Sequence, residues 1–184
     1  MDTQEMSDIN LFDVFGEMLI EDIKTMDEFK SDPNKRPDSV TLEFDIEPLA
    51  VQSVRRGRFG FYSPPKVKAW KELISEDARK QFPWDPYSGP LGLSYIQYRF
   101  AYPKTLKKAI RNRIEAGEVF HMDRRSDLMD NLNKATMDSL AGIIFEDDCQ
   151  IVRFNGLLEK IYSNTPGITM TFNNLEGKVN VLPR

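Results

Sequence analysis

The sequence has very little of the chemistry on which cysteine and histidine enzymes depend. Its 184 residues include one cysteine, Cys149, and one histidine, His121. A single cysteine excludes an internal disulfide and is typical of a reducing compartment. A catalytic Cys/His pair would need these two residues to meet, and a Ser/His/Asp triad would depend on the same histidine. The composition therefore disfavours both kinds of nucleophilic catalysis.

Long apolar stretches and phosphate-binding loops are also absent from the sequence. Apolar residues make up 40% of the chain, and no stretch approaches the roughly 20 apolar residues of a membrane-spanning helix. No basic segment precedes an apolar run at the N-terminus, as it does in a secretory signal. Neither GxxxxGK[ST] nor GxGxxG occurs, which disfavours nucleotide hydrolysis and dinucleotide binding. These absences predict a cytoplasmic, intracellular protein without membrane contact.

The charge of the chain is unevenly divided. The net charge is −4, but residues 1–33 contain ten acidic residues and two lysines, a net charge of −8. The remainder therefore carries a net charge of +4, although it includes an acidic cluster between positions 127 and 148. A basic body of this kind suits the binding of a polyanion such as nucleic acid.

The acidic N-terminal region is predicted to be separate from the rest of the chain. Residues 8–29 carry apolar side chains near i, i+3, i+4 spacing with acidic residues between them, which predicts an amphipathic helix. A polar, proline-bearing linker follows at 31–38. We therefore divide the chain into residues 1–38 and residues 39–184. The apolar stripe of the helix needs a hydrophobic partner, so we expect residues 1–30 to contact the body, a second subunit or another protein.

Residues 39–184 show strand and helix patterns in an uneven order. Apolar and polar residues alternate over 40–46, which predicts a strand, and Pro64-Pro65 begin a predicted helix that ends near Gln81. The other predicted elements are a basic loop or short hairpin at 55–62, a strand at 93–100, helices at 104–115 and 128–141, and antiparallel strands at 150–162 and 168–172. This order predicts an α+β fold with helices packed against a mixed, mainly antiparallel sheet.

Carboxylates gather around the start of the 128–141 helix. Asp127, Asp130 and Lys134 stand at i, i+3 and i+7, so one helical face is expected to present all three, and Asp138 continues that face. Asp147-Asp148 follow in the next turn. Hard cations such as Mg²⁺ and Mn²⁺ prefer oxygen ligands, and a nearby lysine can offset charge on a phosphate. The alternative is an N-cap, an ordinary i,i+4 ion pair and a solvated turn.

Two motifs in this region carry a family resemblance. The first is Asp130-Asn-Leu-Asn-Lys134-Ala-Thr-Met-Asp138-Ser-Leu140, and the second is Asp147-Asp148-Cys-Gln150-Ile151. They resemble the patterns D-x-D-N-[LI]-x-K-[AV]-x-x-D-[AS]-L and D-D-x-Q-[VI] of the RusA-type Holliday-junction resolvases, a family common in phages and prophages. The segment from Phe61 to Trp70 resembles the family's helix entry, and the similarity covers roughly residues 39–173. The N-terminal helix lies outside it.

The resemblance implies a homodimer that binds a branched DNA, the four-way junction, and nicks two opposing strands symmetrically with Mg²⁺, which Mn²⁺ can replace. It implies catalytic roles for Asp127, Asp130, Lys134 and Asp148, and a metal site formed by the three aspartates with Asp147. The candidate contacts to DNA phosphates are Arg55, Arg56, Arg58, Lys66, Lys68, Arg124 and Arg125.

One departure from the family pattern concerns the first aspartate. In the family it usually lies two residues before the second, whereas Leu128-Met129 separate Asp127 from Asp130 here. A bulge in the chain would let Asp127 reach the metal, and this is the interpretation we favour; otherwise Asp127 only caps the helix. Two other functions remain open: a nuclease for other branched or flapped DNA, and a catalytically weak DNA-structure-binding protein whose N-terminal helix recruits a partner.

Overall fold

The computed structural model describes residues 35–50, 55–57, 60–62, 64–123 and 127–180. By its internal contacts the chain divides into Met1–Pro37 and Asp38–Arg184, and the second unit is called the body below. The predicted helix at 8–29 lies outside the described residues. None of the helices in the described part is long and apolar enough to cross a membrane.

The body is built on a four-stranded sheet. Its strands are β1 (Ser39–Phe44), β4 (Leu91–Ala101), β5 (Ile151–Ser163) and β6 (Gly167–Asn174), in the order β1-β6-β4-β5. β6 is antiparallel to both β1 and β4, whereas β4 and β5 are parallel. The predicted α+β fold with a mixed, mainly antiparallel sheet is confirmed.

The last two strands run in opposite directions, as expected, but they do not pair with each other. β5 and β6 follow one another in sequence, but β4 lies between them in the sheet. Tyr98 of β4 is opposite Lys160 on one side and Ile168 on the other. The parallel pairing of β4 with β5 requires a long crossover connection, and α3 and α4 lie within that connection.

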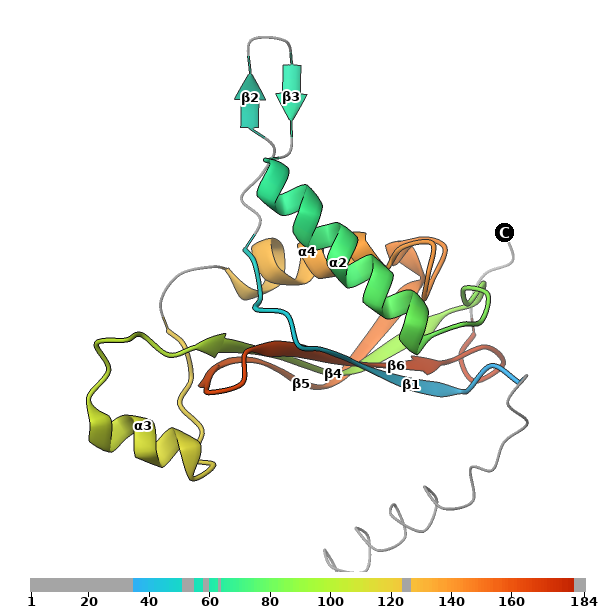
Figure 1. Ribbon diagram of the computed structural model, residues 1–184. Coiled ribbons are helices and arrows are strands. Elements are labelled where there is room, and N and C mark those ends of the chain that lie inside the picture. The colour runs from blue at the N-terminus through green and yellow to red at the C-terminus, as the bar shows by residue number, and fades with distance from the viewer. Residues whose placement is uncertain (1–34, 51–54, 58–59, 63, 124–126, 181–184) are drawn as a thin grey trace, which may run out of the picture. The chain divides into compact units, whose positions relative to one another are not determined.

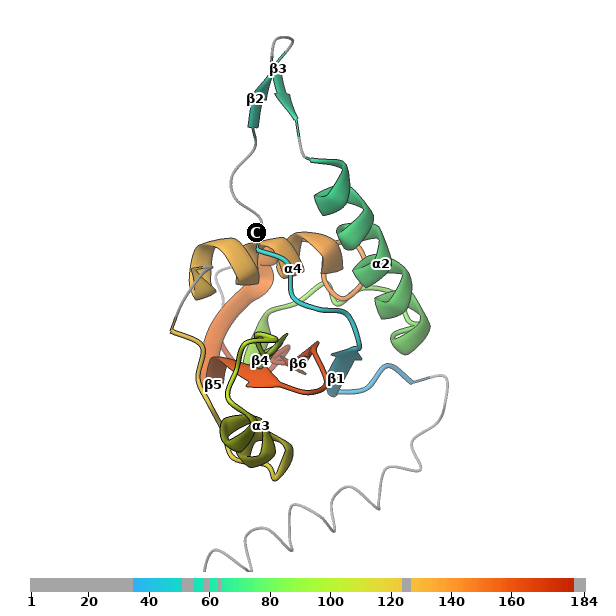
Figure 2. The ribbon, with the colours of Figure 1, turned by 60° about the vertical axis from the view of Figure 1, so that its left-hand side comes forward.

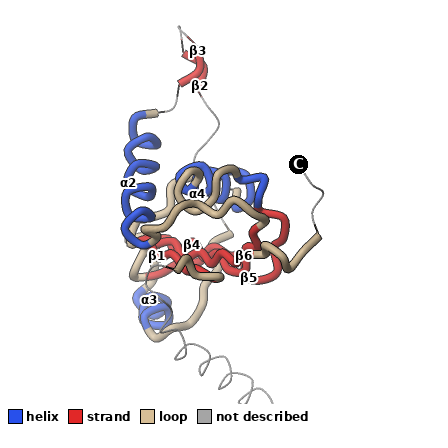
Figure 3. The backbone as a smooth tube through the Cα atoms, turned by 90° about the vertical axis from the view of Figure 1, so that its right-hand side faces the viewer, coloured by secondary structure: helices blue, strands red, loops and turns tan. Residues whose placement is uncertain are grey.

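Two helices cover one face of the sheet. α2 (Pro65–Gln81) and α4 (Lys134–Leu140) lie side by side on this face, and α3 (Lys108–Glu115) lies on the opposite side (Figures 1, 2 and 3). Pro65 suits the first position of α2 because its φ is already helical and its missing N–H has no partner there. The buried residues of α2 recur at helical spacing: Val67, Trp70, Ile74 and Ala78.

The strands present the other half of the core. In β1 the buried residues Val40, Leu42 and Phe44 alternate with exposed neighbours, as the sequence pattern predicts. A small separate sheet pairs β2 (Arg55–Gly57) with β3 (Gly60–Tyr62), so the predicted loop or hairpin is a hairpin.

β5 carries an irregularity opposite Ser94. Leu93 is paired with Phe154, but Tyr95 is paired with Leu157, so β5 uses one residue more than β4 over this interval. Gly156 lies within the extra length, and a Cβ built there would come 1.7 Å from the Ser94 carbonyl oxygen. A β-bulge of this kind bends the strand, and here it leaves room only for glycine.

We expect Gly156→Ala to lower the free energy of unfolding by about 2 kcal/mol or more, because a methyl group would have to displace strand backbone. Urea denaturation followed by circular dichroism measures this. Gly92→Ala is the matched control, since its Cβ would first meet the flexible end of Leu175 at 3.3 Å. Equal losses in the two variants would contradict the close approach at Ser94.

Candidate active site

The helix that carries the candidate carboxylates begins with a wide turn. Residues Leu128–Asn133 form a π-helical segment, in which the Leu132 N–H donates to the Asp127 carbonyl at 3.2 Å, and α4 continues from Lys134. Single π turns accommodate one extra residue in an α-helix and occur often at functional sites. The additional residue between Asp127 and Asp130 is therefore absorbed as a bulge within the helix.

The wide turn and the start of α4 together present one face that lines a pocket of about 360 Å³. Asp130, Asn133, Lys134 and Met137 stand on this face at i, i+3, i+4 and i+7. The other lining residues are Leu93, Met129, Asp148 and Ile151. The structure thus brings Asp130 and Lys134 together with Asp148, which comes from a separate segment.

A short turn after the helix positions Asp148. Asp148–Gln150 form a single 3₁₀ turn, and the Asp147 carboxylate accepts from the Cys149 N–H at 2.9 Å. The Gln150 side chain returns to this turn, because its Oε1 accepts from the Asp147 N–H at 2.9 Å. These reciprocal contacts form a capping box that fixes the direction in which Asp148 leaves the chain.

Gln150 also attaches the turn to the body. Its side chain is buried, and Nε2 donates to the carbonyls of Tyr87 and Gly89 at 2.7 and 2.9 Å. A buried amide is stable only when its donors and acceptors find partners. The Gln150 amide therefore holds Asp148 at a defined place beside the helix.

A buried tyrosine supports the helical wall of the pocket. The Tyr98 hydroxyl donates to Thr136 Oγ1 at 3.3 Å and lies 3.5 Å from Asn133 Oδ1. Thr136 in turn donates to the Leu132 carbonyl at 3.0 Å. Burial raises the pKa of Tyr98, so its hydroxyl remains protonated at neutral pH and keeps donating to the helix.

The charged groups of the pocket are available to a ligand. Within the described part of the chain, Asp130, Lys134 and Asp148 take part in no salt bridge. Two carboxylates and the amide oxygen of Asn133 form an oxygen-rich donor set, which suits a hard cation. No three His, Cys, Asp or Glu side chains of the described residues gather as a metal-binding group.

Two of the predicted metal ligands act as caps in the structure. Asp127 Oδ1 accepts from the backbone N–H groups of Met129 and Asp130, each at 2.8 Å, and Asp147 caps the 3₁₀ turn. Neither lines the pocket. Each cap uses Oδ1 in these contacts, and a carboxylate has two oxygens, so their roles as ligands stay predictions.

The expectation that Asp138 extends the same face was wrong. Its carboxylate accepts from Lys71 Nζ of α2 at 2.8 Å and lines a different groove, between α2 and α4. Asp138 stands eight residues after Asp130, which places it about 80° further around a regular helix, on the side that meets Lys71 of α2.

The predicted DNA contacts are described only in part. Lys66 and Lys68 are exposed on the first turn of α2, and Lys68 lies 4.0 Å from Glu72. Arg58, Arg124 and Arg125 lie outside the described residues, and for Arg55 and Arg56 only the backbone of β2 is described.

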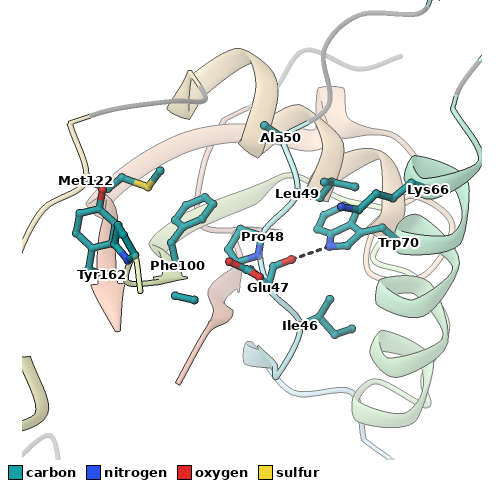
Figure 4. Close-up of a pocket in the computed structure, with 12 residues that line it drawn as sticks. Ile46, Glu47, Pro48, Leu49, Ala50, Lys66, Trp70, Phe100, Met122 and Tyr162 are labelled. Carbon is teal, nitrogen blue, oxygen red and sulfur yellow. Dashed lines mark hydrogen bonds between the residues drawn. The ribbon is translucent and has the colours of Figure 1, made fainter. Parts of the chain in front are cut away.

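A larger hollow of about 910 Å³ lies at the other end of β4 (Figure 4). Its walls are mostly apolar, and Trp70 Nε1 donates to the Glu47 carbonyl at 3.0 Å inside it. Phe100 lines this hollow and Leu93 lines the carboxylate pocket, so the two are separated by roughly 23 Å along the strand. The hollow has one carboxylate, Glu47, and one ammonium group, Lys66. It therefore lacks the paired acids of the smaller pocket.

Three contributors to the site were missed from sequence alone. Asn133 stands one turn after Asp130, and that spacing is a signal that could have found it. Gln150 lies in the recognised motif, but its role as an anchor depends on carbonyls 61 and 63 residues away. Tyr98 lies in a strand pattern and gives no sign of its contact with the helix.

We expect Gln150→Leu to lower the free energy of unfolding by about 2–3 kcal/mol, because the buried Tyr87 carbonyl and the part-buried Gly89 carbonyl would lose their donor. Thermal unfolding measures the loss. DNA cleavage measured well below the lowered melting temperature should also fall, since Asp148 is no longer held. Gln81→Leu is a control glutamine, whose side chain contacts exposed groups of Glu43. A fully active Gln150→Leu variant would show that the turn needs no anchor.

The comparisons with known proteins agree with this geometry. Residues 45–172 match the family described as Endodeoxyribonuclease RusA. The chain is also 26% identical over 116 residues to the uncharacterized protein YqaN of Bacillus subtilis (strain 168), an alignment that covers 63% of this chain and 80% of YqaN. The family match spans the pocket residues and the Gln150 turn. It also includes all of β4 and β5 and most of β6. The chain belongs to the RusA family of endodeoxyribonucleases, which act on Holliday junctions.

Proposed function

We propose that this chain resolves four-way junctions by paired symmetric nicks, with Mg²⁺ or Mn²⁺ held at Asp130 and Asp148. The observation that carries the proposal is the convergence of these two carboxylates and Lys134 in one pocket, from two separate segments. Independent packing of the two segments defines the distance between the carboxylates. The family's activity on junction DNA supplies the substrate.

The donor set of the pocket suits Mg²⁺ in particular. Mg²⁺ in phosphoryl-transfer sites is commonly bound by one or two carboxylates, and waters and substrate phosphate complete its octahedron. Asp130 and Asp148 supply two carboxylates, and the exposed pocket leaves room for DNA. When bound, the ion supplies Lewis-acid chemistry toward the scissile phosphate and an attacking water. Asp127 and Asp147 would complete the set.

The side chains of the pocket would handle the remaining charge. Lys134 lies one helical turn from Asp130 and would offset the negative charge that develops on the phosphate oxygens. Asn133 would position a phosphate or water through its amide. Lys66 and Lys68 would contact the DNA backbone and orient it without reading its sequence, together with Arg55, Arg56, Arg58, Arg124 and Arg125.

Symmetric nicking requires two active sites on one junction. A two-fold homodimer would present the same pocket twice to a roughly two-fold substrate. A nuclease for three-way or flapped DNA could use the same pocket, and a panel of synthetic junctions, flaps and duplexes with Mg²⁺, Mn²⁺ or EDTA separates these substrates. A purely DNA-binding role is disfavoured, because unneutralised carboxylates repel phosphate.

Asp130→Asn and Asp148→Asn are each expected to slow junction cleavage at least about a thousandfold, because a metal ligand is lost, while junction binding is kept. Lys134→Ala should also lose turnover and keep binding. Single-turnover cleavage of labelled four-way junctions and gel-shift titrations measure the two properties.

Asp138→Asn is the matched control for these variants. It lies on the same helix but contacts Lys71 in another groove, so its cleavage rate should stay near that of the wild type. A wild-type rate in Asp130→Asn or Asp148→Asn would refute the proposed metal site.

The role of Asp127 can be separated from its cap. Asparagine caps helices about as well as aspartate, so Asp127→Asn should leave the melting temperature unchanged. We expect cleavage to fall by roughly 10- to 100-fold, less than in Asp130→Asn, because Asp127 lies outside the pocket. An unchanged cleavage rate would leave Asp127 with the capping role alone.

A further inference from the structure

The first half of β5 is exposed along its whole length. The six consecutive residues from Val152 to Leu157 are all exposed, whereas a strand in a covered sheet normally buries every second residue. Large apolar side chains occupy three of these positions, with exposures of 52% for Val152, 45% for Phe154 and 46% for Leu157. Apolar side chains gathered in this way on a protein surface mark an interaction site.

The same segment lies at the edge of the sheet. β5 pairs with β4 on one side, and on its other side the described residues 120–122 meet only its second half, at Lys160–Tyr162. Natural edge strands are commonly protected by charged residues and proline, which discourage pairing with another chain. Between Ile151 and Leu157 the only charged side chain is Arg153, and proline is absent. This edge therefore has few of the features that discourage pairing with another chain.

The exposed segment continues directly into the wall of the carboxylate pocket. Phe154 is paired with Leu93, which lines the pocket, and Ile151 at the start of β5 lines it as well. Met129, another exposed apolar residue of the pocket wall, is 63% exposed. A partner seated on β5 would therefore stand beside the active site.

We infer that the β5 edge, Val152–Leu157, is the surface on which a second copy of this chain docks. This inference rests on the proposed function, because paired nicks require two active sites. The surface suits a two-fold contact, since an uncharged apolar segment is complementary to itself and a two-fold axis places the same patch on both sides. DNA is a poor occupant, because one arginine among apolar residues offers little to a polyanion.

The size of the segment agrees with a dimer interface. Specific interfaces bury about 800 Å² on each partner, a patch roughly 30 Å across. The seven residues from Ile151 to Leu157 extend over about 23 Å, which is enough for the apolar centre of such a patch. Docking here sets the two pockets on either side of the two-fold axis, so the interface fixes the spacing of the two nicks.

The test compares Phe154→Asp/Leu157→Asp with the control Leu73→Asp in full-length protein. Leu73 is equally exposed, at 53%, but lies on α2. We expect wild type and Leu73→Asp to have twice the 21.3 kDa chain mass by light scattering. The β5 variant should dissociate at least about thirtyfold more readily, and it should make single nicks in place of paired ones. Circular dichroism and melting temperature confirm that each variant is folded.

A cross-link tests the contact without disrupting it. In a Cys149→Ser background, Asn155→Cys should give a covalent dimer with a short bismaleimide, because position 155 lies between Phe154 and Leu157. Leu73→Cys should not. A dimer that persists in folded Phe154→Asp/Leu157→Asp, or the absence of the Asn155→Cys cross-link from a dimeric protein, overturns the inference.

Other outcomes assign the surface differently and also overturn the inference. The first is a monomeric protein in which the cysteine of Asn155→Cys reacts with maleimide only after Phe12→Asp/Phe15→Asp is added. That result would place the protein's own N-terminal segment on β5. Asp130→Asn separates this inference from the proposed metal site: it should lose cleavage yet keep the dimer mass. If it keeps cleavage, the metal site fails while the interface stands.

Discussion

The amide of Gln150 is the interaction on which the organisation of the site depends. It joins the carbonyls of Tyr87 and Gly89, which precede β4, to the turn of Asp147 and Asp148. Because β5 begins at the next residue, the same side chain fixes where the parallel strand starts and where Asp148 points. One buried, fully hydrogen-bonded group thus couples the register of the sheet to the position of a carboxylate. Polar groups of this kind give a structure uniqueness more than stability.

The helical half of the site is defined by a departure from regular helix. The π turn begins after Asp127, which caps it by accepting from the backbone N–H groups of Met129 and Asp130. The extra residue is accommodated within this turn, which also carries Asp130 and Asn133 of the pocket. Asp130, Asn133, Lys134 and Met137 keep i, i+3, i+4 and i+7 spacing along the chain, so the pocket takes its charged groups from both the π turn and α4.

Local patterns in the sequence were sufficient for most elements and for the three central site residues. The helix at 65–81 follows from two prolines and an apolar period, and β1 follows from strict alternation. Asp130, Lys134 and Asp148 were found from motif spacing, and the structure places them in one pocket. The pairing of β5 with β4 and the pairing of Asp138 with Lys71 both depend on partners more than 50 residues away. No local pattern specifies such contacts.

The order of the sheet has a consequence for the synthesis of the protein. Of the described strands, β6 is the last in sequence, yet it lies between β1 and β4 and places Phe172 opposite Leu93, a pocket residue. Ser39 is paired with Asn173, so closing the sheet joins residues separated by most of the body, a slow step in folding. A growing chain cannot complete this sheet or seat the wall of its pocket. The sheet and this wall of the pocket are completed only once β6 has been synthesised.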